Sequence, residues 1–197
     1  SGRSAVNPRA RPIDVSRDWF ASPPPDLRVE EIASPQDAAA VCLISQSSGT
    51  TGRPKRVAIT HEQMLVRLER ARMVVPLSVD SRIACPQGPA GGYGSRYMIS
   101  ALSAGAGIIL CSGIDATLAD IERWNATHLV VSPLILAGLV AARGAHAGPI
   151  RSLRILEVGG SRLSDALREA AVRSICPNIV LNYGSSEAGV VAQGRAD

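Results

Sequence analysis

Aromatic residues are scarce in this chain, at 3% of its 197 residues, with one Phe, two Trp and three Tyr. The hydrophobic share of 46% is still large enough for a core, so aliphatic side chains and alanine must fill it. A run of about five or six basic residues is also lacking, which makes a nucleic-acid partner a weak alternative. The net charge of +4 suits anionic ligands without identifying them.

Several other signals are missing. No apolar stretch reaches the length of a membrane span, and no secretion signal is visible. The cysteines form no Cys-x-x-Cys pair and the histidines have no partner at metal-binding spacing; these residues are Cys42, Cys85, Cys111, Cys176, His61, His128 and His146. We therefore expect reduced core cysteines in a cytoplasmic protein, without a zinc site or a disulfide.

The chain divides into two parts by composition. Residues 1–35 are rich in proline and arginine and predict an extended lead-in. Residues 36–197 predict one α/β core. Because the chain does not open on methionine and stops abruptly, we expect it to be a piece of a longer protein.

Short apolar runs alternate with helix-like patterns from residue 41 onward. Strands are predicted at residues 41–45, 82–85, 107–111, 128–132, 153–158 and 178–182, the first of them buried and the last closing the series. Helices are predicted from a capping box at Thr60 and Gln63 to about residue 73, at 96–103, across 118–122, from Pro133, and across 163–171. Met64, Leu65 and Leu68 share one face of the first helix. This alternation predicts a mostly parallel sheet flanked by helices.

Four turns that follow these strands are rich in Gly, Ser or Pro. They span residues 47–55, 86–94, 159–161 and 183–187. Ligands bind at the carboxyl ends of the strands in such sheets, so the four turns predict a single cleft.

The turn at residues 47–55 combines four hydroxyl side chains, two glycines and Lys55. Backbone N–H groups in glycine-rich turns attract anions, and a lysine adds a positive charge, so the turn predicts a polyphosphate site. Gly52 is followed by Arg53, Pro54 and only then Lys55, which excludes the Gly-Lys-Ser/Thr phosphate loop. The alternative is a polar hairpin in which residues 57–60 return as a second strand.

The turn at residues 182–187 is the second candidate. Tyr183 offers a flat ring that can stack on a purine, and Glu187 offers oxygen ligands for Mg²⁺. The alternative is a strand-end turn with a capping serine and a solvated glutamate.

Both turns resemble motifs of the adenylate-forming superfamily, which comprises acyl-CoA synthetases, peptide-synthetase adenylation domains and luciferases. The matching stretches are Ser-Ser-Gly-Thr-Thr-Gly-Arg-Pro-Lys at 47–55 and Tyr-Gly-Ser-Ser-Glu at 183–187, where Ser186 takes the usual threonine position. The Gly159-Gly160-Ser161 turn is similar to the loop that flanks adenine in that family. The resemblance implies nucleotide contacts from Ser47, Ser48, Gly49, Thr50, Thr51, Gly52, Lys55, Gly159, Gly160, Ser161, Asn182, Tyr183, Gly184 and Ser186.

The resemblance also implies roles. The β- and γ-phosphates would be held by Ser47, Thr50, Thr51 and Lys55. Ser186 would contact the α-phosphate and Glu187 would bind Mg²⁺. The expected catalytic residues are Lys55, Ser186 and Glu187. Tyr183 and Gly160 would flank adenine. The implied reaction is the ATP-dependent activation of a carboxylic acid to an acyl-adenylate, with CoA or a carrier-protein thiol as the possible acceptor. The family's closing C-terminal domain is not visible here, so the chain alone is expected to be inactive.

Two positions depart from the family pattern. Arg56 replaces a usual glycine, and Pro89 stands where many relatives have a His or another large side chain. These departures favour the alternative of a non-catalytic nucleotide-binding or interaction module derived from such an enzyme. An unrelated α/β phosphate-binding protein is a third, weaker alternative.

Overall fold

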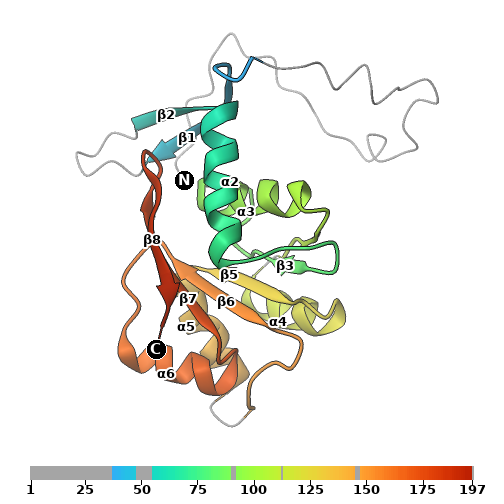
Figure 1. The fold of residues 1–197 in the computed structure, drawn as a ribbon. Helices are drawn as coiled ribbons and strands as arrows, with labels where there is room; N and C mark the ends of the chain where they lie inside the picture. Colours follow the sequence, from blue (N-terminus) through green and yellow to red (C-terminus); the bar gives the residue numbers. More distant parts are fainter. Residues whose placement is uncertain (1–36, 48–54, 90–91, 112, 145–146, 197) are drawn as a thin grey trace, which may run out of the picture. The chain divides into compact units, whose positions relative to one another are not determined.

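The computed structural model of the chain describes residues 37–47, 55–89, 92–111, 113–144 and 147–196 (Figure 1). The predicted lead-in at 1–35 lies outside these residues. A six-stranded sheet has the order β4-β3-β5-β6-β7-β8. Its strands are β3 (Arg82–Ala84), β4 (Gly107–Ile109), β5 (His128–Val131), β6 (Ile155–Gly159), β7 (Ile179–Ser185) and β8 (Gly189–Arg195). The first five are parallel and β8 runs antiparallel to β7, which confirms the mostly parallel sheet.

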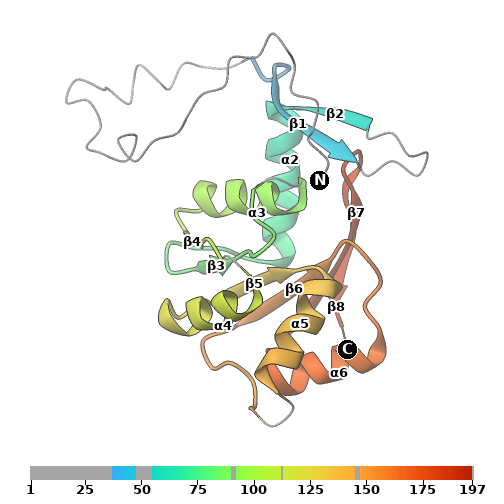
Figure 2. The same cartoon turned by 180° about the vertical axis from the view of Figure 1, so that it is seen from behind.

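Helices cover both faces of this sheet. They are α2 (His61–Val74), α3 (Gly92–Ser103), α4 (Ile114–Arg123), α5 (Pro133–Arg143) and α6 (Asp165–Ser174). Figures 1 and 2 show α3 on one face, with α4, α5 and α6 on the opposite face. Helix α3 begins four residues earlier than the sequence predicts, at Gly92 instead of Arg96.

The aliphatic core follows from this layering. All four residues of β5 are buried, because helices cover the strand on both sides. Leu129 and Val131 join the cluster formed with α4, α5 and α6, whereas Val130 joins the cluster formed with α3. Each fully buried leucine or isoleucine stabilises the fold by about 1.5–3 kcal/mol, so a core poor in aromatic residues is sufficient.

Local signals predict the starts of α2 and α5 correctly. The Thr60 hydroxyl accepts a hydrogen bond from the Gln63 N–H at 3.2 Å, and Gln63 Oε1 accepts one from the Thr60 N–H at 3.1 Å, which confirms the capping box. Helix α5 starts at Pro133 as predicted. The helical face predicted for α2 is wrong at Leu65, which is 63% exposed, because the buried stripe of the helix consists of Met64, Leu68 and Ala71. Leu163 precedes α6 instead of lying in it.

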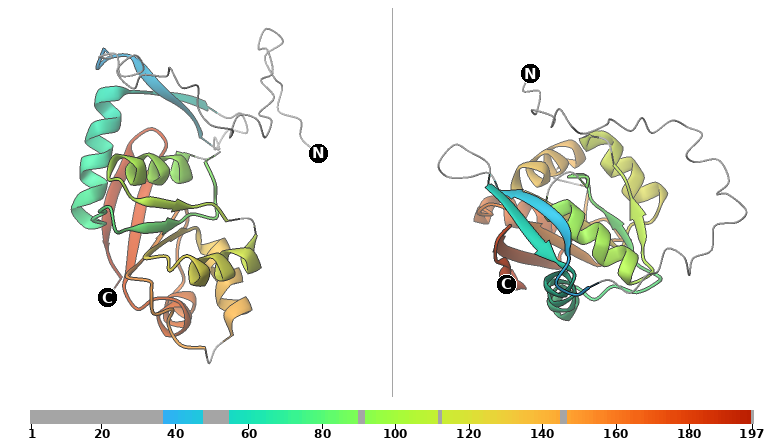
Figure 3. Two further views of the ribbon diagram at one scale, coloured as in Figure 1. Left: turned by 90° about the vertical axis from the view of Figure 1, so that its right-hand side faces the viewer. Right: turned by 90° about the horizontal axis from the view of Figure 1, so that it is seen from above.

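The prediction for residues 41–45 needs the largest correction. Strand β1 (Val41–Ser47) pairs only with β2 (Lys55–Thr60), in a separate antiparallel sheet, and not with the parallel sheet. Figure 3 shows this β1–β2 hairpin set apart from the six strands. Val41 and Ile44 are exposed, and Ser45 is the one buried residue among positions 41–45, so the strand is not buried. The alternative in which residues 57–60 return as a second strand is therefore confirmed, because these residues pair with β1.

The end of the chain also differs from the prediction. Strand β7 does not close the series, because β8 follows it, and residues 183–187 lie in the β7–β8 hairpin. All four cysteines are free thiols, but Cys42 is exposed, so its prediction as a core residue is wrong. None of the helices in the described ranges is long and apolar enough to cross a membrane.

Candidate functional site

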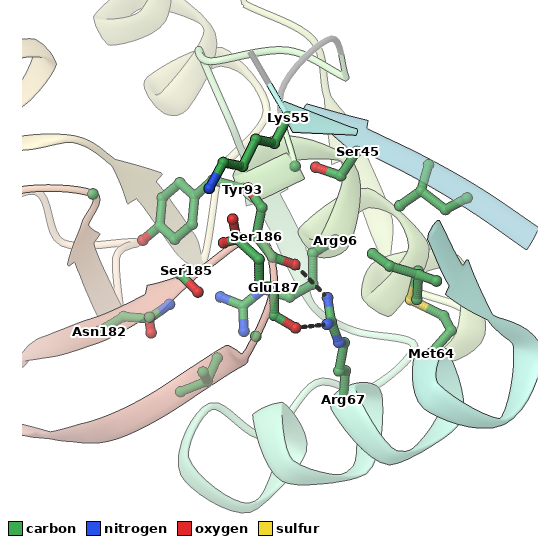
Figure 4. A pocket seen from close by; sticks show the side chains of 17 residues that line it. Ser45, Lys55, Met64, Arg67, Tyr93, Arg96, Asn182, Ser185, Ser186 and Glu187 are labelled. Atoms are coloured by element: carbon green, nitrogen blue, oxygen red, sulfur yellow. Dashed lines mark hydrogen bonds between the residues drawn. The ribbon is translucent and has the colours of Figure 1, made fainter. Parts of the chain in front are cut away.

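A cavity of about 470 Å³ is bounded by the β1–β2 hairpin, helices α2 and α3, and the β7–β8 hairpin (Figure 4). This volume is in the range of small-molecule sites. Lys55, Gly92, Gly160 and Ser186, one residue from each of the four predicted turns, line it together. Described residues of all four turns thus line one cavity, even though β1 and β2 do not belong to the parallel sheet.

The structure brings some of the predicted site residues to the cavity and not others. Those that line the cavity are Lys55, Gly160, Asn182, Gly184, Ser186 and Glu187. Gly159, Ser161 and Tyr183 are not among its lining residues, and Tyr183 is 72% exposed on β7. Ser47 pairs with Lys55 in the β1–β2 hairpin. Ser48, Gly49, Thr50, Thr51 and Gly52 lie outside the described residues.

Arg67 of α2 fixes the tip of the β7–β8 hairpin. Its guanidinium donates from Nη1 to the Ser186 carbonyl at 3.3 Å and from Nη2 to the Glu187 carbonyl at 2.8 Å, as Figure 4 shows. Gly189 lets the chain pass close to this arginine: its φ is +71°, and a β-carbon there would lie 3.2 Å from Arg67 Nε. The helix that starts directly after β2 therefore holds the backbone that carries Ser186 and Glu187.

A buried arginine forms part of the opposite wall. Arg96 of α3 is 8% exposed, and its Nη2 donates to the Tyr97 hydroxyl at 2.7 Å. Its guanidinium carbon lies 4.4 Å from the centroid of the Tyr97 ring and 5.7 Å from that of Tyr93. Such cation–π contacts help to hold the charge in place. The Tyr93 ring reaches β6, where a β-carbon at Gly159 would come within 2.8 Å of its hydroxyl, so this wall requires glycine at position 159.

Behind this wall lies a carboxylate with no exposure, Glu157 of β6. Its Oε1 accepts hydrogen bonds from Asn182 Nδ2 at 2.8 Å and Gln193 Nε2 at 3.1 Å, and it lies 3.7 Å from Arg96 Nη2. Burial raises the pKa of Glu157 from an ordinary 4.5 to about 7, against the opposing effects of Arg96 and the two amides. The buried carboxyl therefore holds its proton to a higher pH than an exposed glutamate does.

The charges around the cavity favour an anion. Lys55, Arg67 and Arg96 line it, against one lining carboxylate, Glu187. Burial, and then the nearby Arg96, lower the pKa of Arg67, and this repulsion between two guanidinium groups is relieved when an anion binds. No group of three or more His, Cys, Asp and Glu side chains with metal-binding geometry occurs among the described residues. Glu187 is thus the cavity-lining carboxylate that can contribute to a metal site shared with a ligand.

Sequence reasoning missed Arg67, Tyr93, Arg96 and Glu157. Glu157 did give a signal, because it is the one charged side chain within the apolar stretch 155–158 of its strand. Arg67 and Arg96 gave none, because an arginine on a helix usually lies on a solvated face. Their partners come from elements roughly 60 to 120 residues away in the chain.

Comparisons with known proteins give matches in sequence and in fold. A sequence model of the family described as AMP-binding enzyme matches residues 5–197. The chain is 28% identical over 171 residues to enterobactin synthase component E of Escherichia coli, covering 84% of the chain and 32% of that protein. It is 31% identical over 180 residues to 4-coumarate–CoA ligase-like 5 of Oryza sativa, covering 79% and 31%.

The comparison with solved structures shows a shared fold. O-succinylbenzoate coenzyme A synthetase of Bacillus subtilis, solved in complex with ATP and magnesium ion, aligns with a TM-score of 0.71 at 18% identity, covering 81% of this chain and 33% of that one. The chain thus spans about a third of the length of the proteins it matches.

Proposed function

Because this chain belongs to the AMP-binding enzyme family, we propose that it forms the nucleotide-binding part of an enzyme that activates a carboxylic acid with MgATP. The products are pyrophosphate and an acyl-adenylate, which a thiol of CoA or of a carrier protein then attacks. The observation that supports this proposal best is the meeting of Lys55, Gly160, Ser186 and Glu187 in one cavity.

The cavity has groups suited to a triphosphate. Lys55 would contact the β- and γ-phosphates, and Ser186 the α-phosphate. The Ser45 hydroxyl is buried without a hydrogen-bond partner in the described part of the chain. A β-carbon at Gly92 would lie 2.5 Å from Ser45 Oγ and 3.8 Å from Ser186 Oγ, so the two hydroxyls face the same small space. Glu187 is the carboxylate that would hold Mg²⁺, which neutralises phosphate charge when bound.

The reaction needs no nucleophile from the protein. An oxygen of the substrate carboxylate forms a bond to the α-phosphorus while the bond from that phosphorus to the bridging oxygen of pyrophosphate breaks. Cations positioned before the reaction stabilise the charge on the equatorial oxygens and on the leaving group. Lys55 at the start of β2 would supply one such positive charge. Arg67 holds the backbone that carries Ser186 and Glu187 in place.

The base end of the nucleotide would lie between two neighbouring strand ends. Gly159 of β6 pairs with Asn182 of β7 in parallel register, so Gly160 and Tyr183 follow side by side. Tyr183 is exposed and its ring is free to take a flat partner. We therefore expect adenine to bind between Gly160 and the Tyr183 ring.

Separating the two ends of the nucleotide tests this function. Tyr183→Ala should weaken both adenosine and ATP by about 1–3 kcal/mol, the range for a base stacked on an aromatic platform, while Tyr183→Phe keeps the ring and the affinity. Glu187→Gln should leave adenosine binding unchanged and reduce the Mg²⁺ dependence of ATP binding, because adenosine has no phosphate to recruit the metal. Calorimetric titrations with both ligands, with and without Mg²⁺, measure this. Equal weakening of adenosine and ATP by Glu187→Gln would mean that the carboxylate is structural.

A further inference from the structure

The cavity has two chemically different sides. Leu43 of β1, Ile59 of β2 and Met64 of α2 form an apolar side. Tyr93 and Arg96 of α3 and Asn182 of β7 form a polar side. A ligand that occupies this space therefore meets hydrocarbon on one side and hydrogen-bonding groups on the other.

The polar side is incompletely satisfied. Arg96 Nη1 and Asn182 Oδ1 are buried and have no hydrogen-bond partner among the described residues. Buried polar groups in folded proteins almost always have a partner, and leaving one unpaired beside a bound apolar group is costly. Arg96 lines the cavity and is more than nine-tenths buried, so an acceptor in the cavity is its natural partner.

The charge of Arg96 is also poorly balanced within the protein. Glu157 lies 3.7 Å from Arg96 Nη2, longer than a hydrogen bond, and its Oε1 is engaged by Asn182 and Gln193. The other charged groups that line the cavity are Lys55 of β2, Arg67 of α2 and Glu187 of the β7–β8 hairpin. Two cations against one carboxylate leave an excess of positive charge beside Arg96.

We infer that Arg96 selects, among carboxylic acids, those that bear a second anionic or hydrogen-bond-accepting group, above all a second carboxylate, at the end remote from the reacting carboxylate. The apolar side accepts the hydrocarbon between the two groups. A planar guanidinium binds a carboxylate through two parallel hydrogen bonds, which a lysine cannot reproduce. The inference rests on the proposed function, since it assumes that the acid occupies this cavity.

Matched acyl-adenylate mimics test the inference directly. The probes are N-acyl sulfamates of adenosine in two pairs: adipoyl with 6-methylheptanoyl, and terephthaloyl with 4-isopropylbenzoyl. In each pair an isopropyl group of similar shape replaces the remote carboxylate. We expect the unmodified chain to bind the carboxylate member of at least one pair roughly 10- to 100-fold more tightly, the range for a hydrogen-bonded charge pair.

Variants then assign the preference to Arg96. Arg96→Met should abolish the preference within each pair, and Arg96→Lys should keep part of it. Arg151→Met, which removes an exposed arginine in the turn before β6, is the matched control and should behave as the unmodified chain does. Should Arg96→Met fail to fold, the comparison within the unmodified chain and the Arg96→Lys variant still decide the question.

Three results would overturn the inference. Equal binding of both members of each pair by the unmodified chain would refute the selectivity and leave the proposed function intact. Equal weakening of both members and of ATP by Arg96→Met would assign Arg96 to the nucleotide instead of the acid. Failure of all four mimics and of ATP to bind would refute the proposed function itself, and the inference with it.

Discussion

Replacing Glu157 with glutamine is expected to stabilise the chain more at pH 8 than at pH 5, by an amount on the order of 3 kcal/mol. Burial raises the pKa of this carboxyl from 4.5 to about 7 in the folded state. Between these two values the folded chain keeps a proton that the unfolded chain releases. The free energy of unfolding therefore falls as the pH rises through this window, and glutamine, which does not titrate, removes that loss.

The difference between variant and unmodified chain isolates this effect. His128 contributes the opposite slope, because burial and then Arg154 lower its pKa to about 4, so its stabilisation is lost as the pH falls from about 6.5. That slope is present in both proteins and cancels. Glu157→Gln also leaves Arg96 without a carboxylate partner. Any resulting cost in the free energy of unfolding is the same at both pH values, because an arginine stays charged between pH 5 and pH 8.

Urea denaturation at pH 5 and pH 8 measures the difference. Glu169→Gln, which removes an exposed carboxylate of α6, is the matched control for the same substitution at the surface. An equal effect of Glu157→Gln at both pH values would show that the Glu157 carboxyl titrates alike in the folded and the unfolded chain.

Replacing Lys55 with alanine is expected to weaken ATP binding by roughly 10- to 100-fold and to leave adenosine binding unchanged. Lys55 lines the cavity from the start of β2, and a hydrogen bond to a charged phosphate contributes about 1.5–3 kcal/mol. Adenosine lacks the group that the lysine would contact. Lys55→Arg keeps the positive charge and should retain most of the affinity.

Calorimetry with both ligands measures this change, and the shift in melting temperature on addition of MgATP gives an independent reading. If Lys55→Ala weakened the binding of adenosine and of ATP equally, Lys55 would have a structural role and would not contact the phosphates. If Lys55→Ala bound ATP with unchanged affinity, the assignment of Lys55 on the β1–β2 hairpin to the ATP site would be wrong.

Much of the fold was predictable because local chemistry specifies it. The buried strand β5 contains the apolar run 129–131 and is followed by Ser132 and Pro133 at the start of α5, and the Thr60–Gln63 pair marks the start of α2. Strand β8 was missed because Gly189–Arg195 mixes small, apolar and polar residues, and its place depends on pairing with β7. Strand β1 was misplaced for a related reason, since an apolar run does not say which strand it pairs with.

Some residues of the candidate site could be predicted from the sequence and others could not. Lys55, Gly160, Ser186 and Glu187 could be proposed from the order and wording of their motifs, and the structure brings them to one cavity. Arg67 and Arg96 could not be proposed, because their importance comes from a hairpin tip and a buried carboxylate far away in the chain. The residues that fix and polarise the cavity are thus visible only in three dimensions.

The reactivity of Lys55 toward an amine-selective acylating reagent tests most directly whether this cavity binds MgATP. Lys55 is the only lysine of the chain, so peptide mapping reports it without interference, and the N-terminal amine serves as an internal control. With MgATP at about ten times its Kd, acylation of Lys55 should slow roughly tenfold, while the N-terminal amine reacts at an unchanged rate and adenosine gives no protection. Binding of MgATP that leaves the rate at Lys55 unchanged would contradict the assignment of the cavity.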